Sequence, residues 1–171
     1  MSPSRSRTDF YSFNSAILTI SEKRRDNDET GDYLVARLKE QGHRIVARDS
    51  NDGNIYRLRA IISQWIANNG IQLIITNGGT GIAPNKTTHK AISPLLDSQF
   101  KGFGELFRQL SYQDIGSSSL QSDAFGGLAN NTVVLCLPGS PGACQLAWEK
   151  IVKEQLNSQH QPCNFASFFS H

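Results

Sequence analysis

Short apolar runs alternate along this chain with segments whose apolar residues recur at helical spacing. Ala16–Ile20, Ile71–Thr76 and Thr132–Leu137 are apolar and rich in β-branched residues, which is typical of buried strands. From Ile55 to Ile66 the apolar residues recur every three or four positions, which predicts an amphipathic helix that ends at Gly70. Strands that alternate with helices favour βαβ units. We therefore expect an α/β protein, a three-layer α/β/α sandwich around a mostly parallel sheet.

Three further elements continue this pattern. A helix is predicted over Thr30–Gln41, with its cap near Thr30 and its end at Gly42. Arg44–Ala47 is predicted to be a strand, and Ala143–Leu156 is predicted to be the last helix.

Two segments interrupt the alternation. Thr88–Phe107 shows helical spacing only in pieces, because Pro94, Gly102 and Gly104 disfavour a continuous helix. Gly116–Asn131 is rich in serine and glycine, and its pattern predicts no regular element.

The composition limits the class of protein. The chain has 171 residues, enough for one domain, which we expect at residues 14–171 after a flexible N-terminal tail at residues 1–13. The formal net charge is only +2, so nucleic acid is not expected as a partner. The sequence contains no run of about 18 apolar residues, so no membrane association is expected.

The cysteines and histidines do not follow metal-binding spacings. Cys136, Cys144 and Cys163 form no C-x-x-C pair, and the four histidines form no H-x-x-x-H pair. We therefore expect neither a disulfide framework nor a tightly bound metal. Cys136 lies within an apolar run, where a buried thiol is the simplest interpretation. Unpaired thiols fit a cytoplasmic protein.

The predicted strand at Ile71–Thr76 runs directly into the glycine-rich segment Asn77-Gly78-Gly79-Thr80-Gly81. In a parallel α/β sheet, ligands bind beyond the carboxyl ends of the strands. Glycines at that place let backbone N–H groups approach an anion, although a tight strand-to-helix turn explains the same residues without a ligand. The segment matches neither the G-x-G-x-x-G pattern of dinucleotide sites nor the P-loop.

A second loop of this kind, Pro138-Gly139-Ser140-Pro141, leads from a predicted strand into the last helix. Backbone N–H groups at such a place can bind an anion, and an ordinary helix start with Ser140 as its cap fits equally well. Hydroxyl groups of Ser118, Ser119 and Ser122 could join such a site, or these serines could belong to a plain loop.

These motifs, in this order, resemble the MoaB/MogA family of molybdenum cofactor biosynthesis proteins. The resemblance covers nearly the whole chain, from Ala16 to Phe165, and rests on many separate motifs. The matching segments are Thr19-Ile20-Ser21, Asp28 to Gly31, Trp65-Ile66, Ile75 to Gly81, Gly102-Phe103-Gly104-Glu105 with Arg108, Leu120-Gln121-Ser122, Leu137-Pro138-Gly139-Ser140, Ala147-Trp148-Glu149 and Pro162-Cys163-Asn164-Phe165.

The resemblance implies a molybdopterin-binding, MogA-like fold that assembles as a homotrimer or homohexamer. It further implies that active relatives adenylylate molybdopterin in a reaction that depends on Mg-ATP. The pterin would be the ligand, and the substrate-binding residues that the resemblance implies are Asn77, Gly78, Gly79, Thr80, Gly81, Ser118, Ser119, Ser122, Pro138, Gly139, Ser140 and Pro141. We add Lys86 to the expected substrate-binding residues because of its positive charge.

The chain departs from the family pattern where carboxylates are expected. The aspartate of an Arg-Asp-x-Thr-Pro-Glu segment is replaced by Lys86, which puts a cation where Mg²⁺ needs an anion. The alignment places Gly53 at the second family carboxylate, so Asp52, one residue away, is the remaining candidate for a catalytic residue. Asp123 stands where the family has arginine.

These departures favour a molybdopterin-binding protein with weak or absent adenylyltransferase activity. Lys86, His89 and Lys90 could still attract a phosphorylated pterin or ATP. The alternative is a non-catalytic oligomeric scaffold that acts through protein contacts, and a flavodoxin-like flavin protein fits the order of layers alone. The docking elements of a scaffold would be the aromatic residues near the two ends, Phe10, Tyr11, Phe13, Phe165, Phe168 and Phe169.

Overall fold

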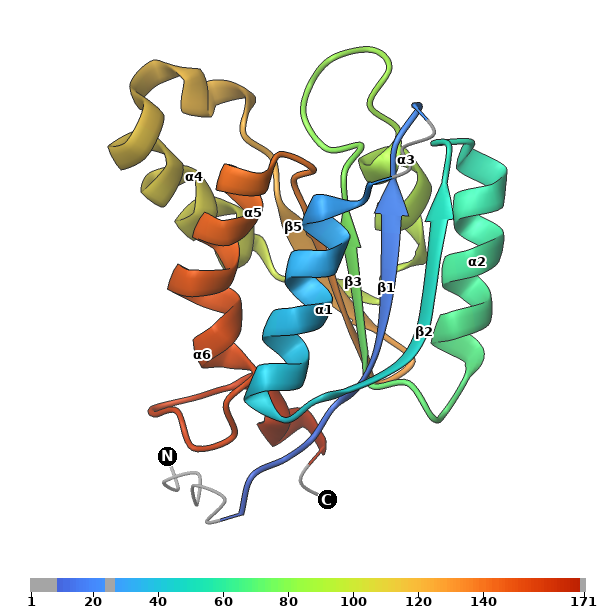
Figure 1. Cartoon of the computed structure of the whole chain (residues 1–171), viewed down its shortest axis with the longest axis vertical. Coiled ribbons are helices and arrows are strands. Elements are labelled where there is room, and N and C mark those ends of the chain that lie inside the picture. Colours follow the sequence, from blue (N-terminus) through green and yellow to red (C-terminus); the bar gives the residue numbers. More distant parts are fainter. Residues whose placement is uncertain (1–8, 24–26, 170–171) are drawn as a thin grey trace.

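Six strands form one mixed sheet in the order β2-β1-β3-β6-β5-β4 (Figure 1). The computed structural model describes residues 9–23 and 27–169. The strands β2, β1, β3 and β6 are parallel to their neighbours, whereas β5 pairs antiparallel with β6 and β4 pairs antiparallel with β5. The strands are β1 Asn14–Ile20, β2 Arg44–Asn51, β3 Leu73–Asn77, β4 Ser98–Gln99, β5 Phe125–Ala129 and β6 Thr132–Leu137.

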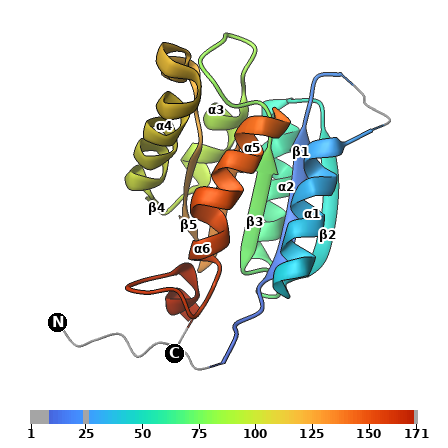
Figure 2. The same ribbon diagram turned by 60° about the vertical axis from the view of Figure 1, so that its left-hand side comes forward.

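Helices cover both faces of the sheet, which confirms the predicted three-layer α/β/α sandwich. The helices α1, α4 and α5 pack on one face, and α2 and α3 pack on the other (Figure 1, Figure 2). The helices are α1 Glu29–Gln41, α2 Ile55–Ala67, α3 Thr88–Ile92, α4 Lys101–Ile115, α5 Pro141–Ala147 and α6 Lys153–Gln155, with a π-helical turn at Trp148–Val152 between the last two and 3-10 turns at Ser93–Leu95, Gly116–Gln121 and Phe165–Phe169.

Side chains that alternate along each strand supply two separate cores. Ile17 of β1 is buried on the face of the sheet that carries Leu34 of α1 and Phe107 of α4. Its neighbour Leu18 is buried on the opposite face, against Ile62 of α2. A strand with a helix layer on each side needs apolar residues at successive positions, which explains the continuous apolar runs in the sequence.

The two segments that interrupted the sequence pattern form the antiparallel end of the sheet. Gly116–Asn131, for which no regular element was predicted, contains β5. The helix α4 runs without a break through Gly102 and Gly104, so the predicted interruption at these glycines is wrong. At Gly104 the reason is tertiary packing, because a Cβ there would lie 2.8 Å from the carbonyl oxygen of Ala124.

The start of α1 lies slightly earlier than predicted. Asp28 is its N-cap, and its carboxylate accepts a hydrogen bond from the Gly31 N–H at 2.9 Å. The cap was predicted near Thr30, which lies inside the helix, and the Thr30 hydroxyl donates to the carbonyl oxygen of Gly139 at 2.9 Å. This bond ties the start of α1 to the loop that follows β6.

The chain is already packed before residue 14. Phe13 is fully buried in the core, and Tyr11 stacks on Phe169 with ring centroids 5.6 Å apart. Near the other end, Phe165 stacks on Phe100 at 5.3 Å. The predicted flexible tail covered residues 1–13, of which 1–8 lie outside the described residues. The terminal aromatic residues thus pack within the chain, although Phe10 and Phe168 keep about two fifths of their surface exposed.

The three cysteines differ in how deeply they are buried. Cys136 and Cys144 are buried, Cys163 is exposed, and all three are unpaired. Burial raises the pKa of the Cys136 and Cys144 thiols to about 12, so both stay neutral and act as apolar groups. In the described part of the chain, no helix has the length and apolar character needed to span a membrane.

The turn after β3 is packed so closely that only glycine fits. Gly78 has φ +104°, and a Cβ on it would lie 2.0 Å from the carbonyl oxygen of Ile20. Gly79 has φ +68°, and its Cβ would lie 2.2 Å from the Thr88 hydroxyl oxygen. Both conformations are ones that L side chains rarely adopt. These two glycines are therefore required by the packing of β1, β3 and α3 around the turn.

A Gly78→Ala substitution is expected to lower the free energy of unfolding by more than about 2 kcal/mol, because it forces a backbone clash at a positive φ. The matched control is Gly142→Ala in α5, where a Cβ meets nothing within 4 Å and alanine favours the helix. Urea denaturation measures both. Equal stability of the two variants would show that the turn is not under this constraint.

His43 is buried at the end of α1 with its imidazole between aromatic rings. Its Nδ1 accepts the Phe13 backbone N–H at 3.1 Å, and Phe10 and Phe13 lie with ring centroids 5.2 and 5.3 Å from it. Burial lowers its pKa from 6.5 to about 4. The folded state therefore holds His43 neutral, with Nδ1 free to accept the bond from Phe13.

Because the unfolded chain binds a proton at this histidine more readily than the folded one, stability is complete above pH 6.5 and falls as the pH drops toward 4. The loss is up to about 3 kcal/mol. His43→Asn keeps an acceptor for Phe13 but does not titrate. We expect the gap in free energy of unfolding between wild type and variant to narrow between pH 7 and pH 4.5; a constant gap contradicts the assignment.

Candidate functional site

The carboxyl ends of β1, β3 and β6 meet at one edge of the sheet, and a cleft of about 1080 Å³ opens there. Figure 1 shows this edge at the top of the molecule, beneath the loop after β3 and beside the 3-10 turn after α4. The geometric rule for parallel sheets predicted a site at this edge. The Gly78 N–H donates to the carbonyl oxygen of Leu137 at 3.0 Å, which holds the loop after β3 against the loop after β6.

The cleft brings together nearly all of the residues that the resemblance implied. Ser119 is the exception: it is buried inside the 3-10 turn and does not line the cleft, because this turn directs its side chain inward. The predicted residues that line the cleft are Asp52, Asn77, Gly78, Gly79, Thr80, Gly81, Lys86, Ser118, Ser122, Pro138, Gly139, Ser140 and Pro141.

The glycines on the floor of the cleft differ in why their positions favour glycine. A Cβ on Gly139 would lie 3.0 Å from the Cα of Gly78, so the two loops pack backbone against backbone. Gly81 has φ +104° but more space, since its nearest neighbour would be the Gln121 carbonyl oxygen at 3.6 Å. The abundance of glycine is thus explained in large part by close packing, and it does not by itself indicate a ligand.

A polar network extends from the outer strand β2 to the cleft. Arg48 of β2 pairs with Asp28 at 3.2 Å and with Asp32 at 2.6 Å. The Asp28 carboxylate also accepts the Thr19 hydroxyl at 2.6 Å, and Thr19 lies 3.2 Å from Oδ1 of Asn77. Thr19, Asp28 and Asn77 all line the cleft.

The network keeps Asp28 ionised. Partial burial raises the pKa of this carboxyl, but the hydrogen bonds from Thr19, Gly31 and Arg48 outweigh burial and hold the pKa below its usual range. A carboxylate with three donors has little capacity left for a metal ion or a ligand. We conclude that Asp28 acts as a fixed negative charge that orients its neighbours.

The turn after β2 lies against the end of the glycine loop. The Thr87 hydroxyl donates to the carbonyl oxygen of Gly53 at 2.7 Å, which brings the Asp52 turn beside Lys86. One Asp52 oxygen accepts the Asn54 N–H at 3.0 Å, and the other lies 3.5 Å from Arg57. Among the described residues, no carboxylate forms an ion pair with Lys86.

A further wall of the cleft is formed by α4 and by the 3-10 turn at Gly116–Gln121. The hydroxyl oxygens of Ser111 and Ser122 lie 2.7 Å apart, and Asp114 and Asp123 line the same wall. Sequence reasoning missed Thr19, Ser111 and Asp114 as cleft residues. Thr19 belongs to a segment that resembles the family, but the resemblance assigns it no role, and nothing in the local pattern marks Ser111 or Asp114. These residues reach the cleft through the pairing of β1 with β3 and the position of α4.

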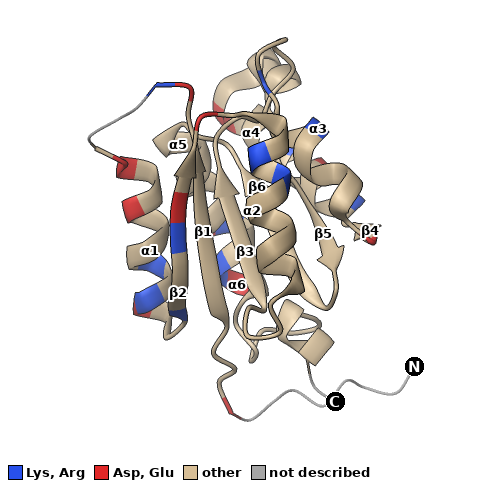
Figure 3. Cartoon of the chain, turned by 90° about the vertical axis from the view of Figure 1, so that its right-hand side faces the viewer, with Lys and Arg blue, Asp and Glu red and all other residues tan. Residues whose placement is uncertain are grey.

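The donor set does not form a metal site within the described ranges, residues 9–23 and 27–169. No three histidine, cysteine, aspartate or glutamate side chains there are grouped so that they could hold an ion. Asp114 and Asp123 line the wall formed by α4 and the 3-10 turn, whereas Asp28 and Asp52 are already engaged in hydrogen bonds elsewhere in the cleft. Figure 3 shows Lys and Arg residues interspersed with Asp and Glu residues over β2 and α1. The site therefore does not fit a Mg²⁺ ion held by paired carboxylates.

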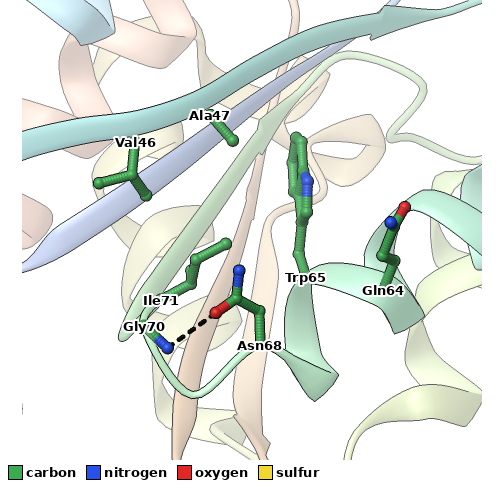
Figure 4. Close-up of a pocket in the computed structure, with 7 residues that line it drawn as sticks. All are labelled: Val46, Ala47, Gln64, Trp65, Asn68, Gly70 and Ile71. Atoms are coloured by element: carbon green, nitrogen blue, oxygen red, sulfur yellow. Dashed lines mark hydrogen bonds between the residues drawn. The ribbon is translucent and has the colours of Figure 1, made fainter.

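A second, smaller cavity of about 410 Å³ lies at the other end of β2, between this strand and α2 (Figure 4). Trp65 forms one side of it, Val46 and Ala47 form another, and Asn68 bonds the Gly70 N–H at 2.8 Å. The residues that line it are uncharged. It offers no positively charged side chain for an anion, so the large cleft is the better candidate site.

Comparison with known proteins identifies relatives of similar length and fold. Residues 16–158 match the family model of the probable molybdopterin binding domain. The chain is 43% identical to molybdenum cofactor biosynthesis protein B of Escherichia coli K12 over 159 residues, 92% of this chain and 94% of that protein.

Two solved structures share the fold. A crystal structure of molybdenum cofactor biosynthesis protein B matches with a TM-score of 0.81 and 38% identity, over 85% of this chain and 92% of the other. The tungsten cofactor synthesizing protein MoaB of Pyrococcus furiosus matches with a TM-score of 0.75 and 28% identity, over 84% and 92%. The chain therefore belongs to the family of molybdopterin-binding domains that includes the molybdenum cofactor biosynthesis proteins B.

Proposed function

We propose that this chain binds molybdopterin or a closely related pterin in the large cleft, and that it adenylylates the pterin weakly or not at all. The observation that carries the proposal is the position of Lys86: it lines the cleft beside the glycine loop and forms no ion pair with a described carboxylate. An unpaired ammonium group in a cleft favours an anionic ligand such as the pterin phosphate.

The cleft supplies what a phosphorylated ring needs. Its volume of about 1080 Å³ exceeds what a single ring requires, and its walls carry the hydroxyl groups of Ser118 and Ser122. The backbone of Gly79 and Gly81 borders it without side chains in the way. These groups bind and orient a ligand; they do not form an evident acid–base or nucleophilic pair.

Adenylylation with Mg-ATP is the step that this donor set supports least. The ion that accompanies a triphosphate needs carboxylate ligands, whereas Lys86 would repel it. Asp52 is the one predicted catalytic residue, and the Asn54 N–H and Arg57 already hold its carboxylate. We therefore assign Asp52 a role in shaping the turn, and we derive no step through Mg²⁺.

The exposed apolar residues around the cleft support a homotrimer or homohexamer, proposed here alongside the binding function. Ile82, Leu120 and Ile115 are between 50 and 78% exposed, and Tyr112 is 64% exposed. Exposed apolar residues of this size often lie in protein contacts. Light scattering of the purified protein would measure the mass directly, and a monomer would contradict this part of the proposal.

We place the protein in the cytoplasm, in keeping with its free thiols.

The binding function predicts a thermal effect without turnover. Molybdopterin at 100 times its dissociation constant is expected to stabilise the protein by about 2.7 kcal/mol. Incubation with molybdopterin, ATP and Mg²⁺, followed by chromatography, is expected to give little adenylylated product. Rapid formation of that product contradicts the inactive form of the proposal. Absence of any stabilisation contradicts pterin binding itself and leaves the protein-contact scaffold as the alternative.

Replacing Lys86 by alanine is expected to weaken binding of molybdopterin and of inorganic pyrophosphate about tenfold, because one charge-assisted hydrogen bond is lost. The matched control is Lys90→Ala, which removes the same charge from α3 at a residue that does not line the cleft. Isothermal titration of both variants at one salt concentration measures the difference. An equal loss in both would mean that only the overall charge matters.

A further inference from the structure

Asn77 ends β3 on the floor of the cleft and is only 2% exposed. Its register partner across the sheet is Thr19, and the Asn77 amide lies against the Thr19 hydroxyl. The other polar atom of the amide has no hydrogen-bond partner among the described residues. A nearly buried amide with one unpartnered group at the edge of a cleft is a feature that a ligand satisfies.

The Thr19 hydroxyl faces two oxygens but carries a single proton. It lies 2.6 Å from Oδ2 of Asp28 and 3.2 Å from Oδ1 of Asn77. The contact with Asp28 is the shorter of the two, and its acceptor is an ionised carboxylate that Arg48 and the Gly31 N–H hold in place. A charged acceptor attracts the proton more strongly than a neutral amide oxygen. The proton therefore belongs to the bond with Asp28.

This assignment leaves Thr19 with only lone pairs toward Asn77. Two oxygens that face each other without a proton repel, whereas an amide nitrogen at the same place donates a hydrogen bond. A half turn of the Asn77 amide exchanges its oxygen and nitrogen at almost no cost in shape. The fixed charge of Asp28 thus sets the direction of the whole chain of bonds, from Asn77 to Thr19 to Asp28.

We propose that Asn77 donates its amide N–H to Thr19 and presents its carbonyl oxygen to the cleft, where it accepts a hydrogen bond from an N–H group of the ligand ring. This inference rests on the proposed pterin binding and adds the part of the ligand that is recognised. The matching chemistry is a nitrogen heterocycle with amino or lactam N–H groups, such as the 2-amino-4-oxo edge of a pterin. A phosphate offers no such donor, so Asn77 and Lys86 select different parts of one ligand.

Two substitutions of Asn77 test whether the oxygen or the nitrogen of its side-chain amide faces the cleft. Asn77→Leu has a similar shape and no acceptor, and we expect it to bind pterin-6-carboxylate about tenfold more weakly in a fluorescence titration. Asn77→Gln keeps a neutral amide, with an acceptor for the cleft and a donor for Thr19, and is expected to bind pterin-6-carboxylate more tightly than Asn77→Leu does. The pyrophosphate affinity of Asn77→Leu is expected to be unchanged within about twofold, because the phosphate does not contact this residue.

The results distinguish the two proposals. If the wild type binds no pterin, the proposed function fails. If the wild type binds pterin and Asn77→Leu binds it equally well, or if Asn77→Gln binds as weakly as Asn77→Leu, only the role of Asn77 fails. Should the variants not fold, hydrogen exchange of the Asn77 side-chain amide in the ¹⁵N-labelled wild type decides. One protected amide proton without ligand is expected, and rapid exchange of both protons overturns the proposal.

Discussion

The close approach of three strand ends, with no side chain between them, is the constraint on which the rest of the structure depends. Gly78 sits with its backbone against the carbonyl oxygen of Ile20 on one side and against Gly139 on the other. Any larger residue at position 78 would push β1 and β3 apart at the edge where the cleft opens. The floor of the site is therefore made of backbone, and its polar character comes from the few side chains that can still reach it.

Those few side chains are arranged by electrostatics across the sheet. Arg48 on β2 neutralises the cap of α1, and the ionised Asp28 in turn fixes the Thr19 hydroxyl. Parallel pairing places Thr19 opposite Asn77, so an ion pair on the outer strand influences an amide on the cleft floor. In this chain the acid at the start of α1 organises the polar groups of the cleft, while Lys86 supplies the positive charge that we propose meets an anionic ligand.

The two halves of the cleft suit two halves of a ligand. Lys86 offers positive charge near the loop after β3, and the glycine backbone of that loop borders the cleft without side chains. The hydroxyl pair Ser111–Ser122 and the amide of Asn77 offer neutral hydrogen-bonding groups on the facing wall and the floor. A molecule with an anionic end and a nitrogen-rich ring has the matching distribution of groups. This match concerns how a ligand would be bound, and it involves no chemical step.

The local sequence pattern was enough to predict the helices and strands whose apolar residues are continuous or periodic. The alternation of these elements then predicted the order of the layers. The runs at Ala16–Ile20 and Thr132–Leu137 are strands because both of their faces are buried, and the chain itself carries that information. The loop at Asn77–Gly81 was placed at the correct edge by the same reasoning.

The tertiary structure decided what depends on contacts between distant segments. β5 contains two glycines and is held by pairing with β6, so its own residues do not indicate a strand. Helix α4 continues through Gly104, and the residue there is glycine because Ala124 leaves no room for a side chain. Ser119 was predicted to line the cleft but turns inward, and Thr19 was missed although it lines it. A side chain's direction and partners are set by neighbours that lie far away along the sequence, and no local pattern records them.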